Sequence, residues 1–259
     1  MVQAEVQAVV QRGGQAGSQR DRLTAALEAV VIGDRMAADR CVQGAGEWQS
    51  GLLQTAAACV QGSRLEPLAW RAHFQALPNP VAVSISAFPV LWVMADAHGH
   101  RRASVHCWGS ALGLSAEAVL ACEQLFTVLC QTMKTASGLN MAAGDRPSEA
   151  VASPVGQALA LVGQSQGQFT MAQGLACRRG WNSAAIALVS LLAGMLGGRA
   201  SLGSALRQRW LLDYSPPRLD PWRGLEGDAL VALAAALHGR WAGVVPQGTT
   251  SPGPLGLRG

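Results

Sequence analysis

Five polar side chains of this sequence carry oxygen atoms of the kind that can bind a hard cation. Asp34 follows a predicted helix, Gln49 and Ser50 open another, and Asn182 and Ser183 precede an apolar run. Magnesium needs several anionic oxygen ligands, and enzymes use it to orient a substrate and to activate water. Only Asp34 in this set is anionic, and neutral oxygens alone hold a hard divalent cation weakly.

The apolar run from Ala185 to Gly198 predicts a buried helix with small residues spaced along it. Small residues would let a neighbouring helix approach closely. The N-terminus of such a helix favours charged groups. The run is shorter than the roughly 20 residues that cross a bilayer, so the sequence predicts a core helix and no membrane association.

The residues around this run resemble the ADP-ribosylglycohydrolase family. In that family a GDTDT segment opens a buried helix of the form IAAIAGALAGAYYG, and a tryptophan follows. The chain keeps this frame at Ala193-Gly194, Gly197-Gly198 and Trp210. The aspartates of the family motif fall on Trp181 and Ser183.

Two further segments support the resemblance. Residues 22–38 are similar to the family's first helix, RIRGALLGLAIGDALGA, with Gly33-Asp34 retained, and residues 46–56 are similar to GxWTDDTxMAL. All four TDDT residues are replaced here, by Gln49, Ser50, Gly51 and Leu52. A weaker match, at 86–91, resembles the MRVAPLAL segment without its arginine.

The resemblance implies a compact orthogonal multi-helix bundle and a site for two magnesium ions that act on a glycosidic bond. The replaced ligands imply that this site is vestigial. Its residues would be Asp34, Gln49, Ser50, Asn182 and Ser183, with the Trp181 indole filling the space of a metal and ribose. Asp34 has two interpretations, a residual ligand or a structural residue at the end of its helix. The short connection at 35–47 implies that the family's loop over the substrate is deleted.

We therefore expect an ADP-ribosylglycohydrolase-like pseudoenzyme, without a cofactor, that binds or scaffolds a protein partner or a ribosyl-type small ligand. One alternative is a diverged active hydrolase of ADP-ribosyl bonds, with magnesium held by other carboxylates around Asp34. Glu47, Glu66 and Asp96 are the candidates for that role. Another is an unrelated helical protein, in which Gly33-Asp34, Trp48 and Gly180 would not converge.

Composition predicts an all-α fold, because apolar residues make up 49% of the 259 residues, alanine and leucine dominate, and β-branched runs are short. We expect a flexible leader at 1–20, one domain at 21–243 and a disordered tail at 244–259. The N-terminus lacks the pattern of a signal peptide, which predicts a cytoplasmic protein. Helices are predicted at about 22–32, with Asp21 as N-cap, and at 48–61, 66–76, 115–133, 155–164, 169–177, 185–198 and 228–238. The stretch 86–97 is apolar and interrupted by Pro89.

The net charge of +4 comes mostly from arginine. The pairs Arg101-Arg102, Arg178-Arg179 and Arg207 with Arg209 could bind a phosphate or an acidic partner bidentately. These pairs are scattered and not interleaved with aromatic residues, so nucleic-acid binding is not predicted.

The cysteines show no CxxC or CxxH spacing, which favours reduced structural thiols. His98, His100 and His106 could form a metal or phosphate site. A solvated basic turn is the favoured interpretation, because no carboxylate or cysteine lies at ligand spacing in the sequence.

Overall fold

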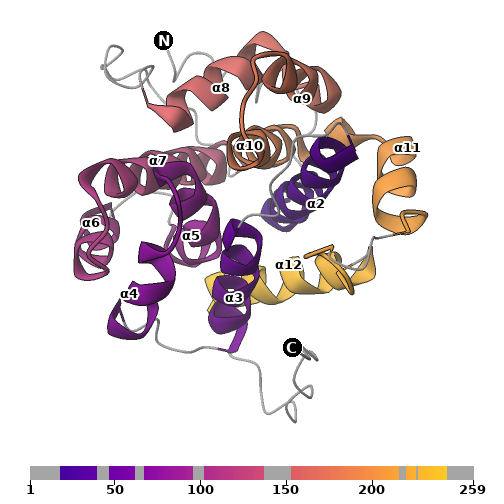
Figure 1. Ribbon diagram of the computed structural model, residues 1–259. Helices are drawn as coiled ribbons and strands as arrows, with labels where there is room; N and C mark the ends of the chain where they lie inside the picture. The colour runs from indigo at the N-terminus through magenta and orange to yellow at the C-terminus, as the bar shows by residue number, and fades with distance from the viewer. Residues whose placement is uncertain are drawn as a thin grey trace.

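The computed structural model describes residues 18–39, 47–61, 67–95, 102–136, 153–215, 220–225 and 227–243. Every regular element in these ranges is a helix, which confirms the all-α prediction (Figure 1). The elements are α2 (Gln19–Asp39), α3 (Glu47–Gln61), α4 (Pro67–Gln75), α5 (Pro80–Met94), α6 (Arg102–Ala111), α7 (Ala116–Ala136), α8 (Pro154–Gln164), α9 (Phe169–Arg178), α10 (Ser183–Leu202), α11 (Ser204–Arg207), the π-helical turn η1 (Gln208–Leu212) and α12 (Asp228–Trp241).

Helices α2 and α10 form an antiparallel pair at the centre of the fold. Gly33 faces Ser190, Gly194 faces Ala25, and Gly198 lies beside Asp21. Residue numbers therefore increase along α10 as they decrease along the facing side of α2, which makes the pair antiparallel. A Cβ added at Gly194 would collide with the Ala25 carbonyl oxygen and the Ala29 side chain. The expected close approach through small residues is confirmed here.

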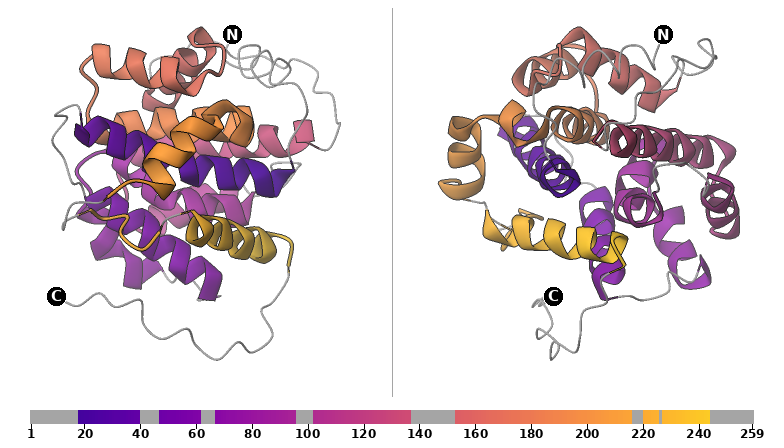
Figure 2. Two further views of the ribbon diagram at one scale, coloured as in Figure 1. Left: turned by 90° about the vertical axis from the view of Figure 1, so that its right-hand side faces the viewer. Right: turned by 180° about the vertical axis from the view of Figure 1, so that it is seen from behind.

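The other helices surround this pair. Helices α8 and α9 pack on α10, α3 packs on α5, and α5 packs on α7. In Figures 1 and 2, α8 and α9 lie at the top, the α5, α6 and α7 group lies at one side, and α12 runs along the bottom beside α2 and α3. The segments that hold Asp34, Gln49 and Trp222 therefore meet where α2, α3 and the chain before α12 come together.

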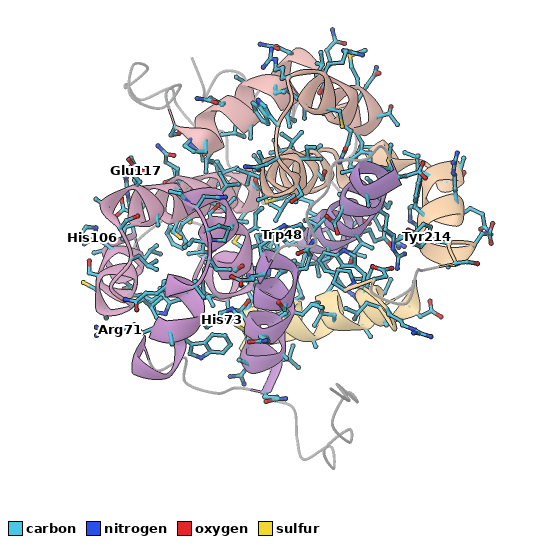
Figure 3. The ribbon with its side chains drawn as sticks, viewed as in Figure 1. Trp48, Arg71, His73, His106, Glu117 and Tyr214 are labelled. Atoms are coloured by element: carbon cyan, nitrogen blue, oxygen red, sulfur yellow. The ribbon has the colours of Figure 1, made fainter. Side chains whose placement is uncertain are left out.

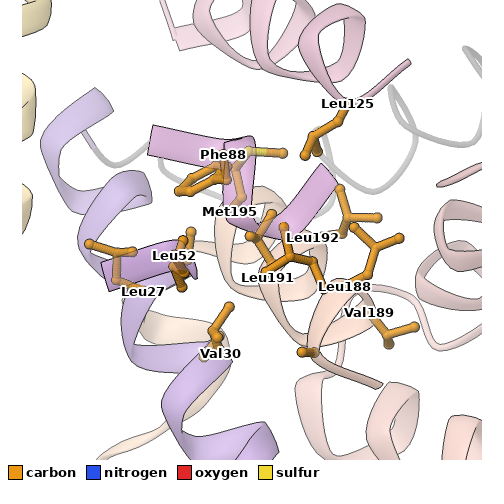
Figure 4. Close-up of a cluster of buried hydrophobic side chains, with 14 of the residues drawn as sticks. Leu27, Val30, Leu52, Phe88, Leu125, Leu188, Val189, Leu191, Leu192 and Met195 are labelled. Atoms are coloured by element: carbon orange, nitrogen blue, oxygen red, sulfur yellow. The ribbon is translucent and has the colours of Figure 1, made fainter. Parts of the chain in front are cut away.

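One continuous apolar core joins these helices. Side chains of α2, α3, α5, α7 and α10 interdigitate in its centre (Figure 4), among them Leu27, Leu52, Phe88, Leu125 and Leu192. Helices α5 and α10 are apolar on nearly every face and buried along most of their length, which is typical of helices inside a core.

Several predicted helix boundaries were wrong. The first helix does not end at Ile32 but continues to Asp39, since Met36 and Ala37 are buried. Its cap is not Asp21, because the Ser18 hydroxyl accepts the Asp21 amide at 3.1 Å. Pro89 does not interrupt its helix: α5 passes through it, as burial on all sides outweighs the lost hydrogen bond.

Helix α6 was not predicted from the sequence. It occupies residues 102–111, and its only buried residues in the described structure are Val105 and Gly109. That apolar signal is too short to be recognised in the sequence. The turn expected around the histidines, at 99–102, lies, apart from Arg102, outside the described residues. The predicted tail at 244–259 and residues 1–17 of the predicted leader at 1–20 lie outside the described residues. Residues 19 and 20 of that leader belong to α2.

Helix α10 is longer than its apolar run suggested. With 20 residues it is the one helix in the described part of the chain that is long and apolar enough to cross a membrane by length and composition. However, 72% of its most apolar window is buried by the surrounding helices, as expected for a core helix.

The described cysteines carry free thiols, and Cys59, Cys122 and Cys130 are buried as small apolar side chains. Burial raises the pKa of the Cys59 and Cys122 thiols to about 12. These two thiols are therefore protonated and unreactive at neutral pH.

Candidate functional site

The Asp34 carboxylate lies inside the protein and is held by two side-chain donors. The Trp222 indole Nε1 donates to Oδ2 at 2.7 Å, and the Gln49 amide Nε2 lies 3.3 Å from Oδ1 and 3.2 Å from Oδ2. Asp34 is 9% exposed and the other two are 1% exposed. The Trp48 ring covers Trp222, with 5.8 Å between ring centroids. We call Asp34, Gln49, Trp48 and Trp222 the Asp34 cluster.

Burial has the largest effect on the pKa of the Asp34 carboxylate. Desolvation raises the pKa of Asp34 above its ordinary value, and the hydrogen bonds from Trp222 and Gln49 act against that rise. The negative charge of Asp220 also raises this pKa, whereas Arg35 lowers it. Both donors to Asp34 are uncharged, so they stabilise the carboxylate without neutralising it.

Arg35, the next residue of α2, forms a second buried polar group beside the cluster. Its Nε and Nη2 donate to Asp220 Oδ2 at 3.2 and 2.9 Å, and its Nη1 donates to the Trp210 carbonyl oxygen at 2.6 Å. The guanidinium also lies 4.5 Å from the centre of the Tyr214 ring. Arg35 thereby ties the segments at 210–214 and 220–222 to α2.

Position 51, where the family motif has a second aspartate, has no room for a side chain. A Cβ at Gly51 would lie 2.5 Å from the Ser86 hydroxyl and 3.0 Å from His73 Nε2. Helices α3 and α5 are bonded closely here, since Ser86 Oγ donates to the Trp48 carbonyl at 3.2 Å and Thr55 Oγ1 donates to the Ser86 carbonyl at 2.6 Å. A carboxylate at this position would force the two helices apart.

The other predicted site residues take part in local hydrogen bonds. Ser50 is exposed and its hydroxyl donates to the Glu47 carbonyl at 3.0 Å. Asn182 is exposed and caps α10, where its Oδ1 accepts the Ala185 amide at 2.9 Å. Ser183 is the first residue of α10, and Trp181 is partly buried against the core.

The predicted site is therefore brought together only in part. Asp34 and Gln49 are in contact, and Trp48 joins them through Trp222. Among the residues that the structure describes, no hydrogen bond connects this group to residues 180–183, whose backbone amides at Gly180 and Trp181 donate to α9. Figure 3 places Trp48 deep in the molecule, between α3 and the α2 and α10 pair.

The donor set at these positions does not fit a dimagnesium site. Gln49 directs its amide hydrogens, not its oxygen, at Asp34, and Ser50 and Asn182 are engaged within their own helices. No group of three or more His, Cys, Asp or Glu side chains in the described ranges is arranged to hold a metal ion. Gln49 Oε1 and Trp48 Nε1 are buried without a hydrogen-bond partner among those residues.

Of the three histidines, only His106 belongs to a described range. Its Nδ1 lies 2.8 Å from Glu123 Oε1, and Arg102 Nη2 lies 3.5 Å from the other oxygen of that carboxylate. A carboxylate thus accompanies His106 after all, because α7 packs beside α6 and brings Glu123 close. The His106 side chain is 63% exposed, at the edge of the molecule where Figure 3 also places Glu117.

Sequence reasoning missed both Trp222, which donates to Asp34, and Asp220, which pairs with Arg35. Trp222 lies 188 residues from Asp34 along the chain, so no local pattern connects them. The available signal was the tryptophan itself, since an indole in a polar turn is usually buried with its N–H bonded.

Glu66 and Asp96, two proposed substitute ligands, lie outside the described residues, and Glu47 is exposed at the start of α3. A comparison of the chain with family models, curated proteins and solved structures found no match to any of them.

Proposed function

We propose that this protein is an ADP-ribosylglycohydrolase-like pseudoenzyme, which has lost dimetal-dependent hydrolysis and acts by binding or scaffolding. The family assignment rests on the order of the motifs in the sequence. The observation that carries the loss of hydrolysis is the pairing of Asp34 with Gln49 and Trp222. Neutral N–H donors occupy the carboxylate that a metal would need.

The packing around α3 supports the same conclusion. The TDDT positions diverge, because Gln49 points inward to Asp34, Ser50 lies at the surface, and Gly51 packs against Ser86. Two ions bridged by adjacent residues require several oxygens directed at one point. The binding role would then belong to the surface around the Asp34 cluster, with a protein or a ribosyl-type small molecule as ligand.

The alternative, a diverged hydrolase, requires another carboxylate close to Asp34. Asp220 is near enough to affect the pKa of Asp34, but its Oδ2 accepts two hydrogen bonds from Arg35. Recruiting Asp220 as a metal ligand would therefore break a buried ion pair, which is costly.

The direct test is release of ADP-ribose from an ADP-ribosylated protein in the presence of magnesium. We expect no release above a blank, from either wild-type protein or an Asp34→Asn variant. Magnesium-dependent release by the wild type that disappears in Asp34→Asn would overturn the proposal, because it would make Asp34 a functional ligand. Equal release by both proteins would point to a contaminating hydrolase. The proposal would then stand, because Asp34 would make no difference to the release of ADP-ribose.

A further inference from the structure

Glu28 is a charged residue in the middle of the buried part of α2. Its neighbours Leu27 and Ala29 are core residues, and the Glu28 side chain is 0% exposed. A carboxylate in such a place requires charged or hydrogen-bonding partners. The Asp34 cluster makes no use of it, so its role has to be sought elsewhere.

Two arginines from the end of α10 and from α11 surround this carboxylate. Arg199 donates from Nε to Oε2 at 3.1 Å and from Nη2 to Oε1 at 2.8 Å. Arg207 makes the same pair of bonds, at 3.0 and 3.3 Å. Two cations share one anion, so the group carries one surplus positive charge.

Two glycines direct these arginines toward α2. Gly198 has φ of 65° and Gly203 has φ of 67°, backbone values that other residues rarely adopt. Gly198 breaks the course of α10 just before Arg199, and the Ser201 hydroxyl donates to the Gly198 carbonyl at 2.7 Å. The helical course is therefore interrupted at both glycines, and the two guanidinium groups reach the same carboxylate.

Each guanidinium keeps donors that Glu28 does not use. An arginine has five N–H groups, and two from each residue bind Glu28. No hydrogen bond is assigned to either Nη1 among the described residues, and the side chains of Arg199 and Arg207 are 31% and 32% exposed. About one third of each arginine side chain thus remains exposed to solvent, while both guanidinium groups contact the same carboxylate.

Among the described residues, Glu28 is the one acidic side chain that forms an ion pair with Arg199 or Arg207. The Asp21 carboxylate lies beside Gly198, next to Arg199, but makes no ion pair with either arginine in the described part of the chain. Asp21 also interacts electrostatically with Arg22. Asp213 accepts a hydrogen bond from Gln208 at 2.8 Å, and Arg209, which lies over Trp210, adds a further positive charge on the same turn.

We propose that Arg199 and Arg207 bind the phosphate group of a soluble phosphorylated small molecule. Paired guanidinium groups match the oxygens of a phosphate, and a doubly charged anion gains most from two adjacent cations. Glu28 holds both side chains in place before binding, so little side-chain entropy is lost when the ligand arrives. The proposal does not depend on the function proposed above, since Glu28 contacts no member of the Asp34 cluster among the described interactions.

The test is a calorimetric titration with inorganic phosphate and with pyrophosphate at constant ionic strength. We expect wild-type protein to bind phosphate with a Kd of about 1 mM, and pyrophosphate more tightly. The Arg207→Gln variant should bind about tenfold more weakly, because one charge-assisted donor group is lost. The matched control is Arg102→Gln, since Arg102 also pairs with a glutamate but lies on α6, and its Kd should equal that of the wild type.

A second measurement uses the wild type alone, in case Arg207→Gln does not fold. In arginine-labelled protein, the Nε–H NMR signals of two arginine side chains should shift together and saturate with phosphate. Absence of a saturable shift, or an unchanged Kd in folded Arg207→Gln, would overturn the proposal. Binding to phosphatidylserine vesicles without binding to soluble phosphate would also overturn it, because it would assign the arginines to a membrane surface.

Discussion

The hydrogen bond from Trp222 to Asp34 gives a quantitative test of the buried cluster. The Trp222→Phe substitution removes the N–H that lies 2.7 Å from Asp34 Oδ2 and keeps an aromatic ring against Trp48. A hydrogen bond to a charged group contributes about 1.5–3 kcal/mol to stability. The smaller ring adds roughly 1 kcal/mol for the space left in a fully buried site. We expect the free energy of unfolding to fall by about 2–4 kcal/mol at neutral pH.

A double-mutant cycle separates these two contributions. In an Asp34→Asn background the acceptor is neutral, so Trp222→Phe should cost at least about 1 kcal/mol less than in the wild type. Urea unfolding followed by circular dichroism measures all four proteins. The matched control is Trp241→Phe, because the Trp241 indole also donates at 2.7 Å but to the neutral Ala95 carbonyl.

The cycle has a clear negative outcome. Trp241→Phe should show no coupling to Asp34→Asn, since Trp241 is not bonded to the carboxylate. A coupling energy between Trp222 and Asp34 below about 0.5 kcal/mol would mean that the indole does not bind an ionised Asp34, and the account of the cluster would be wrong.

Three further predictions concern the packing at Gly51, the pH dependence of Asp34 and the ion pairs of Glu28. Gly51→Ala should lower the free energy of unfolding by about 1–3 kcal/mol, because the added Cβ meets Ser86. The control Gly174→Ala, where the atom nearest to the added Cβ is 3.9 Å away, should raise it by about 0.5–1 kcal/mol. Equal effects of the two substitutions in thermal unfolding would refute the tight packing at Gly51. Burial raises the pKa of Asp34 in the folded protein above its ordinary 3.8, so protonated Asp34 contributes fully to stability below pH 3.8, and this contribution is lost as the pH rises through the folded-state pKa. The unfolding free energy of Asp34→Asn minus that of the wild type should therefore increase between these two pH values. A difference that does not change with pH would contradict the raised pKa. Glu28→Gln should lower the free energy of unfolding by about 2–3 kcal/mol, which is less than for a fully buried ion pair because both arginines reach water. Glu123→Gln, whose partner Arg102 is 60% exposed, should lower it by under about 1 kcal/mol. Similar urea midpoints for the two variants would argue against a buried arginine pair at Glu28.

The helices with long apolar patterns could be predicted from the sequence, and those without them could not. The α8 and α9 helices were located within a residue or two, since glycine, glutamine and serine residues mark their ends. The α6 helix was missed because only Val105 and Gly109 pack inward. The extension of α2 past Gly33 buries Met36 and Ala37, and Arg35 joins it to Trp210 and Asp220. These partners belong to distant segments and leave no mark in the local sequence.

The candidate site was predictable only where motif order carried information. The match to the family frame placed Asp34 and Gln49 together, and they are in contact. The same match placed Asn182 and Ser183 with them, but Asn182 caps its own helix at the surface. Trp222 and Asp220 are the partners that decide the chemistry of Asp34. They belong to a turn near the end of the chain, and only tertiary packing sets the position of that turn.

The central claim, that Asp34 is held by protein donors and serves no metal, is tested most directly by calorimetric titration with magnesium and with manganese, each with and without ADP-ribose. The account predicts no heat of metal binding, and no effect of either metal on any binding of ADP-ribose. Tight metal binding that strengthens ADP-ribose binding, and that is lost in Asp34→Asn, would contradict it, because Asp34 would then have to exchange its bonds to Trp222 and Gln49 for a metal ion.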